Sequence, residues 1–277
     1  MQKKYIIKQD NLQNDLLTYT KYSDSELTYA KKNADVIWEI KEYIESNDKI
    51  NANEIMMKIF PVNEPHIFIS HKSEHSSHAI RLANIIYEKF KIISFIDSQV
   101  WHHIDDVSNM INQKVSKIRE DGNTTIYNHK STSIVASNMF AMLSSSLFEV
   151  MDCSDGFIYI DSNSQSEIDE IEKGKTENLK TKSPWIFLEM TYASKLRQKM
   201  HKRPRFNDVL KECSGLENLS ESVGIEFDYS KEIIDSVRIN TISDVLRMET
   251  LNHPLFNLDK IYKLLDDKFK LNCNEEN

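Results

Sequence analysis

The chain has 277 residues, of which 40% are hydrophobic and 28% charged, and its formal net charge is −8. A chain of this length and composition can bury a full hydrophobic core, in one large domain or in two smaller ones. The acidic balance argues against a general nucleic-acid surface, because such a surface needs a basic face to displace counterions.

The N-terminal segment develops no apolar signal core, and we find no apolar run of the roughly 18 to 20 residues that span a bilayer. Cys153, Cys213 and Cys273 are isolated and odd in number, which is typical of reduced thiols. We therefore expect a cytoplasmic protein with no membrane partner. The five glycines form neither a GxGxxG motif nor a Walker loop, which excludes those two phosphate-binding cradles.

Residues 1–60 are polar and carry apolar residues at helical spacing, among them Ile37, Ile40 and Ile44. This spacing predicts a helical N-terminal extension. The prolines of "PVNEP" (61–65) then mark a boundary. We predict an α/β domain over residues 61–200 and an α-rich C-terminal elaboration, packed on that domain, over residues 201–277.

The α/β domain is predicted from three short apolar runs. "HIFISH" (66–71) and "IISFID" (92–97) enclose an amphipathic helix within residues 73–90, and a strand–helix–strand unit with tight connections predicts a parallel sheet. A second helix, from about 132 to 152, leads to the third strand, "GFIYI" (156–160). Residues 98–131 are expected to form a loop and one helix, and the polar link 161–182 a surface loop or flap.

The stretch "SPWIFLEMTYA" (183–193) predicts a new helix, with Ser183 as its N-cap and Pro184 in its first turn. In that register Trp185, Glu189 and Tyr192 share one face. The helix follows a strand of the sheet, so it begins at the carboxyl edge, where open α/β folds bind their ligands.

Two fragments together resemble a known family. "IFISHKSEHSSHAIRLANIIYEKF…SFIDS", followed by "FIYIDS…SPWIFLEMTYA", is similar to a Toll/interleukin-receptor (TIR) domain of the bacterial type. The shared motifs are an F-[IL]-S-H-x-S opening, an aspartate after the second strand, and S-x-W-x-x-x-E at a helix start. The resemblance covers about residues 66–197. It implies a flavodoxin-like α/β fold and, as in many bacterial and plant members, cleavage of NAD.

The resemblance also implies roles for individual residues. Glu189 matches the catalytic glutamate and Trp185 the tryptophan that stacks beside nicotinamide. Phe68, Ser70 and His71 match the pocket-lining loop after the first strand, and Asp97 matches the acidic end of the second strand. A carboxylate beside the ribose would stabilise the positive charge that develops as the nicotinamide–ribose bond breaks. NAD is then a substrate, and neither a cofactor nor a metal is required.

The chain departs from the family pattern at several places. Glu74 and His75 stand where the family commonly has aspartate, no glycine lies between residues 97 and 121, and 98–131 and 161–182 are long insertions. These departures bear on the geometry of the substrate and on assembly through the loop after the second strand. Histidines such as His71, His75 and His78 have no Asp, Glu or Cys set that completes a familiar metal site.

The resemblance further implies a context of bacterial anti-phage defence of the Thoeris type, in which a nucleotide product acts on an effector protein. Whether the product is linear, cyclic or conjugated stays open, as does self-association of the domain. Two alternatives remain at this point. One is a non-catalytic interaction module, and the other is a nucleoside deoxyribosyltransferase-like enzyme that uses a similar carboxylate.

Overall fold

A computed structural model describes residues 3–30, 33–60, 65–122, 124–161, 179–181, 183–196, 227–229, 237–239 and 241–275. Five strands form a central sheet in the order β3-β2-β6-β1-β9, and all neighbouring strands in it are parallel. Their bounds are β1 Lys3–Lys8, β2 Ile67–His71, β3 Ser94–Ile96, β6 Gly156–Asp161 and β9 Val237–Ile239. The predicted α/β class with a central parallel sheet is therefore confirmed.

The strand order holds one feature that the sequence did not predict. The order β3-β2-β6 is that of the first three strands of a flavodoxin-like sheet, which runs 2-1-3-4-5. The next position belongs to β1 from the N-terminus, paired with β6 from Lys3↔Gly156 to Lys8↔Asp161. The prediction of a helical N-terminal extension over residues 1–60 is wrong at this strand. Helices follow it as expected: α1 Gln9–Leu16, α2 Asn33–Ser46 and α3 Ala52–Ile59.

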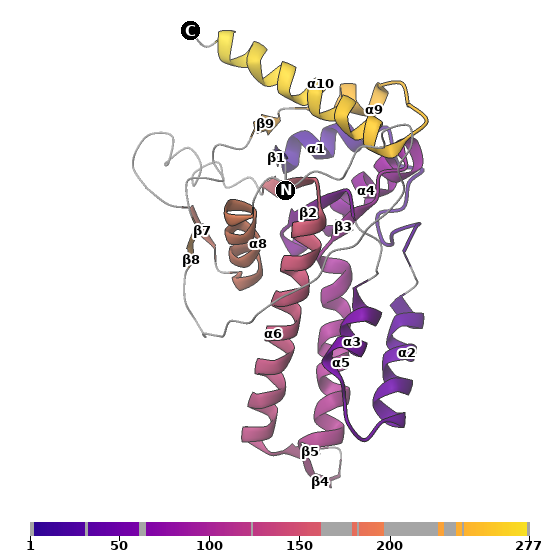
Figure 1. The fold of residues 1–277 in the computed structure, drawn as a ribbon, viewed down its shortest axis with the longest axis vertical. Coiled ribbons are helices and arrows are strands. Elements are labelled where there is room, and N and C mark those ends of the chain that lie inside the picture. The colour runs from indigo at the N-terminus through magenta and orange to yellow at the C-terminus, as the bar shows by residue number, and fades with distance from the viewer. Residues whose placement is uncertain are drawn as a thin grey trace, which may run out of the picture.

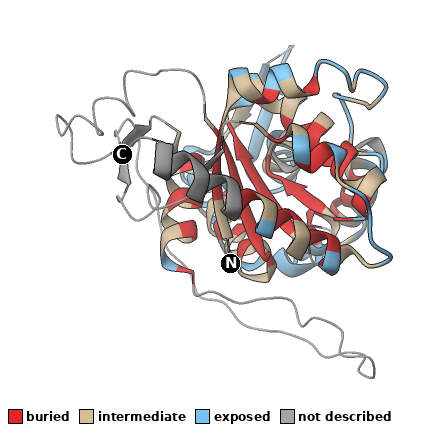
Figure 2. Ribbon diagram, turned by 90° about the horizontal axis from the view of Figure 1, so that it is seen from above, coloured by how far each residue is buried: buried red, intermediate tan, exposed pale blue. Residues whose placement is uncertain are grey.

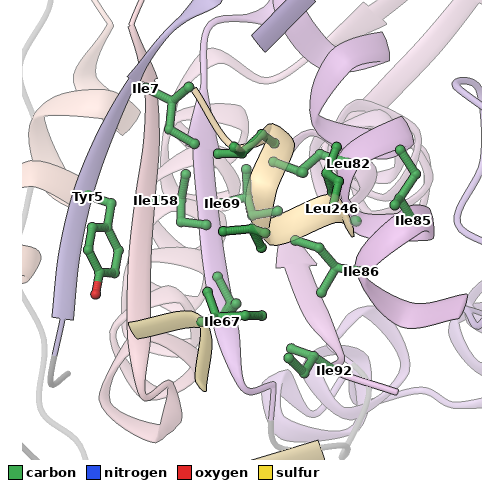
Figure 3. Close-up of a cluster of buried hydrophobic side chains, with 14 of the residues drawn as sticks. Tyr5, Ile7, Ile67, Ile69, Leu82, Ile85, Ile86, Ile92, Ile158 and Leu246 are labelled. Atoms are coloured by element: carbon green, nitrogen blue, oxygen red, sulfur yellow. The ribbon is translucent and has the colours of Figure 1, made fainter. Parts of the chain in front are cut away.

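Helices cover both faces of the sheet. One face packs against α1, α4 (Ser76–Phe90), α9 (Ser243–Arg247) and α10 (Pro254–Glu275). Figure 3 shows part of this core, where isoleucines of β2 and β6 meet Leu82, Ile86 and Leu246. The other face packs against α2, α3, α5 (Ser98–Val115), α6 (His129–Cys153) and α8 (Pro184–Lys195). In Figure 2 the strands accordingly appear as a buried layer between helices with exposed outer sides.

The alternation of β2 decides which side chains reach which face. Ile67 and Ile69 point into the core beneath α4, whereas Phe68 points to the opposite face. The Phe68 ring stacks there with Phe95 and Phe157, at centroid distances of 5.3 and 5.9 Å. Side chains two residues apart in a strand point to the same face, so Ser70 shares the face of Phe68. This is the face that α8 covers.

Four helices extend beyond the sheet. In Figure 1, α2, α3, α5 and α6 run side by side away from the strands, with the hairpin of β4 (Lys117–Asp121) and β5 (Thr124–Tyr127) at their far end. The insertion over residues 98–131 is thus a long helix followed by a hairpin, where we expected a loop and one helix. The helix expected from about 132 to 152 is confirmed as α6.

Among the described residues, α6 is the one helix whose length and apolar composition would allow it to cross a membrane. One side of it is buried in the core, through Val135, Met139, Leu143, Leu147 and Met151. Of the apolar 18-residue window in this helix, 33% is buried, and a single helix of this kind is weak evidence for a membrane span.

The C-terminal part contributes a strand and the last helix. β8 (Phe227–Tyr229) pairs antiparallel with β7 (Leu179–Thr181), and α10 is the last helix of the chain that the structure describes. Residues 162–178, which make up most of the predicted flap, lie outside the described residues, as does nearly all of the basic stretch 195–205.

Candidate active site

The candidate site lies at the carboxyl edge of the sheet, between β2 and β6. The helices that follow these two neighbouring strands cover opposite faces, since α4 packs on one face and α8 on the other. In an open α/β sheet such a switch point forms the crevice where ligands bind. β2 ends here with Ser70 and His71, and Asp97 directly follows β3.

Helix α8 brings a carboxyl group to this edge. Its start is as predicted: the Ser183 side chain accepts a hydrogen bond from the backbone N–H of Ile186, and Pro184 occupies the first turn. Glu189 lies in the second turn and is fully buried. The Ser70 hydroxyl donates a hydrogen bond to Glu189 Oε2 at 2.5 Å. Glu189 is therefore held against the end of β2 and has no solvent-facing surface.

A second carboxyl group lies beside Glu189. Burial raises the pKa of Glu189 well above its usual value of 4.5, and the charge of the Asp97 carboxylate raises it further. The hydrogen bond from Ser70 lowers this pKa, whereas a side-chain hydrogen bond with Asp97 raises it. Burial and the neighbouring Asp97 carboxylate therefore favour the protonated form of Glu189.

His71 continues the polar contacts on the far side of Asp97. Its side chain is fully buried, and its Nδ1 lies 3.3 Å from Asp97 Oδ1. Its Nε2 is 3.0 Å from the hydroxyl of Ser98, which is in turn 3.1 Å from the hydroxyl of Ser76. Ser76 and Ser98 are the first residues of α4 and α5, so both stand at helix N-termini.

Two further histidines lie close by, on η1 (Ser73–His75) and on α4. The rings of His75 and His78 are 6.4 Å apart, and partial burial lowers the pKa of both. Both rings therefore favour the neutral form. Within the described part of the chain, no group of three or more His, Cys, Asp or Glu side chains is arranged to hold a metal ion.

Of the site residues expected from the sequence, four come together: Ser70, His71, Asp97 and Glu189. Phe68 lies deeper, without exposed surface, in the aromatic stack under the sheet. Trp185 is one turn before Glu189, is partly buried, and packs its ring on Phe140 of α6 at a centroid distance of 5.2 Å. The structure gives both rings a packing role, and their contact with a substrate stays a prediction.

Ser76 and Ser98 were not among the expected site residues. Ser98 carried a signal in the sequence, because it directly follows Asp97 at the carboxyl end of a predicted strand. Ser76 carried none, since its proximity to Ser98 depends on how α4 and α5 begin side by side. Comparison with protein-family models, with curated proteins and with solved structures gives no match.

This arrangement has a definite chemical capacity. The buried Glu189 can stabilise a cation that develops next to it when it is ionised, or donate a proton to a leaving group when it is protonated. A histidine behind one of the carboxyl groups, with a hydroxyl on its other nitrogen, can pass a proton onward.

Proposed function

We propose that the protein cleaves the nicotinamide–ribose bond of NAD with Glu189 as the catalytic residue. One observation carries this proposal: Glu189, which matches the catalytic glutamate only by resemblance to the TIR motif, is fully buried at the switch point of the sheet and is hydrogen-bonded to Ser70. A carboxylate on an ordinary helix faces water, because burying a charge that is not paired with an opposite charge is costly.

The chemistry of NAD suits a carboxyl group at this place. As the bond between nicotinamide and ribose breaks, its electron pair neutralises the pyridinium ring and positive charge develops at the ribose carbon. A carboxylate fixed beside that carbon interacts more strongly with the transition state than with the substrate, which is the condition for catalysis. Water then adds to the ribose carbon to give ADP-ribose, or an adenine nitrogen adds to give a cyclic product.

Glu189 must be ionised for this role, although its pKa is raised in the free protein. Binding of the substrate should lower this pKa again, because the pyridinium ring of NAD is a cation. A cation placed next to Glu189 favours its charged form and lowers its pKa. Binding of NAD is thus expected to remove the proton from Glu189.

The raised pKa also favours a second candidate, a nucleoside deoxyribosyltransferase-like activity. A neutral purine or pyrimidine is a poor leaving group and has to be protonated as the glycosidic bond breaks. A glutamic acid whose pKa is raised well above its usual value is suited to that task. Nicotinamide needs no such proton, so the two substrates separate the candidates.

Incubation of the purified protein with NAD, or with free nucleosides and deoxynucleosides, followed by chromatography, tests both proposals. We expect nicotinamide from NAD and no release from nucleosides. Glu189→Gln should abolish the release while the far-UV circular dichroism spectrum stays unchanged. Glu149→Gln, an exposed glutamate of α6, is the matched control and should behave like the wild type. Free base from nucleosides alone would favour the second candidate, and full activity of Glu189→Gln would refute both.

The finer fold assignment belongs to the same proposal. A TIR-type, flavodoxin-like domain is supported by the order β3-β2-β6 and by the positions of the S-H-x-S and S-x-W-x-x-x-E motifs at the carboxyl edge. On this proposal the protein acts in the cytoplasm, in anti-phage defence, through a nucleotide product that reaches an effector. The alternative of a non-catalytic interaction module does not explain why the carboxyl group of Glu189 is buried.

A further inference from the structure

Hydrolysis of NAD releases one proton in each turnover. The glycosidic bond breaks with its electron pair going to nicotinamide, the oxygen of water bonds to the ribose carbon, and the water loses a proton. NAD carries the pyridinium charge whereas nicotinamide is neutral, so this proton appears as net acid. The nearest acceptors are Glu189 and Asp97, whose exposures are 0% and 5%. A buried pair that gains a proton in every cycle needs a path by which to lose it.

The contacts behind Asp97 form such a path. Asp97 Oδ1 lies 3.3 Å from His71 Nδ1, and the opposite ring nitrogen lies 3.0 Å from the Ser98 hydroxyl. The Ser98 hydroxyl is 3.1 Å from that of Ser76. The side chains of Asp97 and His71 are 7% and 0% exposed, and the row ends at the partly exposed Ser98 and Ser76. The two hydroxyl contacts are hydrogen bonds, whereas Asp97 Oδ1 and His71 Nδ1 are in contact without hydrogen-bond geometry, so proton exchange between them requires a small rotation of a side chain.

We propose that His71, Ser98 and Ser76 form a proton relay from the Asp97–Glu189 pair to solvent, a role that rests on the proposed function. His71 accepts a proton at the nitrogen that faces Asp97 and releases one from the nitrogen that faces Ser98. The hydroxyl of Ser98 accepts this proton and gives its own to Ser76, which gives its own to water. No bond to carbon changes in the relay, and no oxidant or second reactant is needed. The three residues act on this proposal as relay residues, through Asp97 and Glu189.

Two single-hydroxyl deletions test the relay and leave the buried His71 ring in place. Ser98→Ala and Ser76→Ala each remove one link, whereas Ser77→Ala removes an exposed hydroxyl from the same turn of α4 and is the matched control. In the resting full-length protein, NMR with transfer of saturation from water measures how fast the ring N–H of His71 exchanges. We expect both deletions to slow this exchange about tenfold or more and the control to leave it unchanged.

Nicotinamide release supplies the second measurement. Ser98→Ala and Ser76→Ala should lower kcat by on the order of a hundredfold, the lower end for loss of a proton-transfer group, with KM unchanged. Wild-type rates of exchange and turnover in both deletions would overturn the relay. If the wild type releases no nicotinamide, the proposed function fails, and the exchange measurement alone still decides whether the relay exists.

Discussion

Two features of its surroundings disfavour the ionised form of Glu189. Its carboxyl group has no exposed surface, and the neighbouring Asp97 carboxyl adds repulsion to the cost of burial. Both effects disfavour the ionised form, and the single hydrogen bond from Ser70 offsets only part of them. A group in this state destabilises the folded protein whenever the pH would ionise it in the unfolded chain.

This cost predicts a particular dependence of stability on pH. The folded-state pKa of Glu189 is raised, so above about pH 4.5 the unfolded chain loses this proton first. The free energy of unfolding then decreases as the pH rises, by up to about 1.4 kcal/mol per pH unit, until the folded-state pKa is passed. Glu189→Gln cannot ionise and should lack this loss. Urea unfolding of both proteins between pH 4 and 8 should give a stability difference that grows in favour of the variant.

Asp97→Asn is the control for the source of the shift. Asp97→Asn removes the carboxylate that repels Glu189 and leaves Glu189 buried. The difference in free energy of unfolding between Asp97→Asn and the double variant Asp97→Asn/Glu189→Gln should therefore grow less with pH than the difference between the wild type and Glu189→Gln. A difference that does not change with pH in the original pair would contradict the raised pKa of Glu189.

At the residue scale, the sequence predicted which side chains lie close together, but not how their contacts change the pKa of Glu189. Ser70, His71 and Asp97 each end or follow a strand, and the carboxyl ends of parallel strands share one edge, so their proximity followed from the pattern. The raised pKa of Glu189 did not follow, because it depends on the side-chain positions of Asp97 and Glu189. Phe68 was expected to line the pocket, whereas in the structure it is fully buried one pleat below Ser70, in the aromatic stack.

At the element scale, α8 depends on its N-terminal cap. Ser183 accepts from the backbone N–H of Ile186, which would otherwise lie without a partner in the first turn. Ser183→Ala should lower the free energy of unfolding by about 1 kcal/mol, and Ser183→Asp, which can also accept, should retain most of it. Chemical denaturation measures both. Equal losses in the two variants would mean that the hydroxyl does not cap the helix.

The elements that were predicted correctly had strong local signals. β2, β3 and β6 are apolar runs next to polar ends, and α4 carries a clear apolar stripe. In each of them the apolar residues have the spacing of the element that buries them. β1 has only Tyr5, Ile6 and Ile7 between lysines, which is too short a run to identify a strand inside a sheet. The β4–β5 hairpin lies at the surface, with every residue of β4 exposed, so no alternation of buried positions could mark it.

At the scale of the whole molecule, the two ends of the chain hold one sheet together. β1 pairs with β6 on one side and with β9 on the other, so segments from before residue 61 and after residue 200 share strands with the predicted α/β domain. Side chains reinforce this pairing: Lys3 forms an ion pair with Asp266 of α10, at 2.5 Å. Sequence patterns are local and contain no signal for such a long-range closure.

A further contact between the two ends is made by Asp15 at the end of α1. Its carboxylate accepts hydrogen bonds from the hydroxyls of Thr241 and Ser243 and from the backbone N–H of Ile242, the last at 2.6 Å. This cluster fixes the start of α9 against α1, and α9 in turn buries Leu246 in the core under α4.

Asp15→Ala leaves these donors without their acceptor, and the loss of hydrogen bonds to a charged group should reduce the free energy of unfolding by about 2 to 3 kcal/mol. Asp10→Ala, an exposed aspartate of the same helix, should change it by less than about 0.5 kcal/mol. Urea unfolding followed by circular dichroism compares the two. Because the same sheet carries Ser70 and His71, the loss should appear as one cooperative transition at lower urea. A separate early transition confined to the C-terminal segment would instead show that the two ends unfold independently of the site.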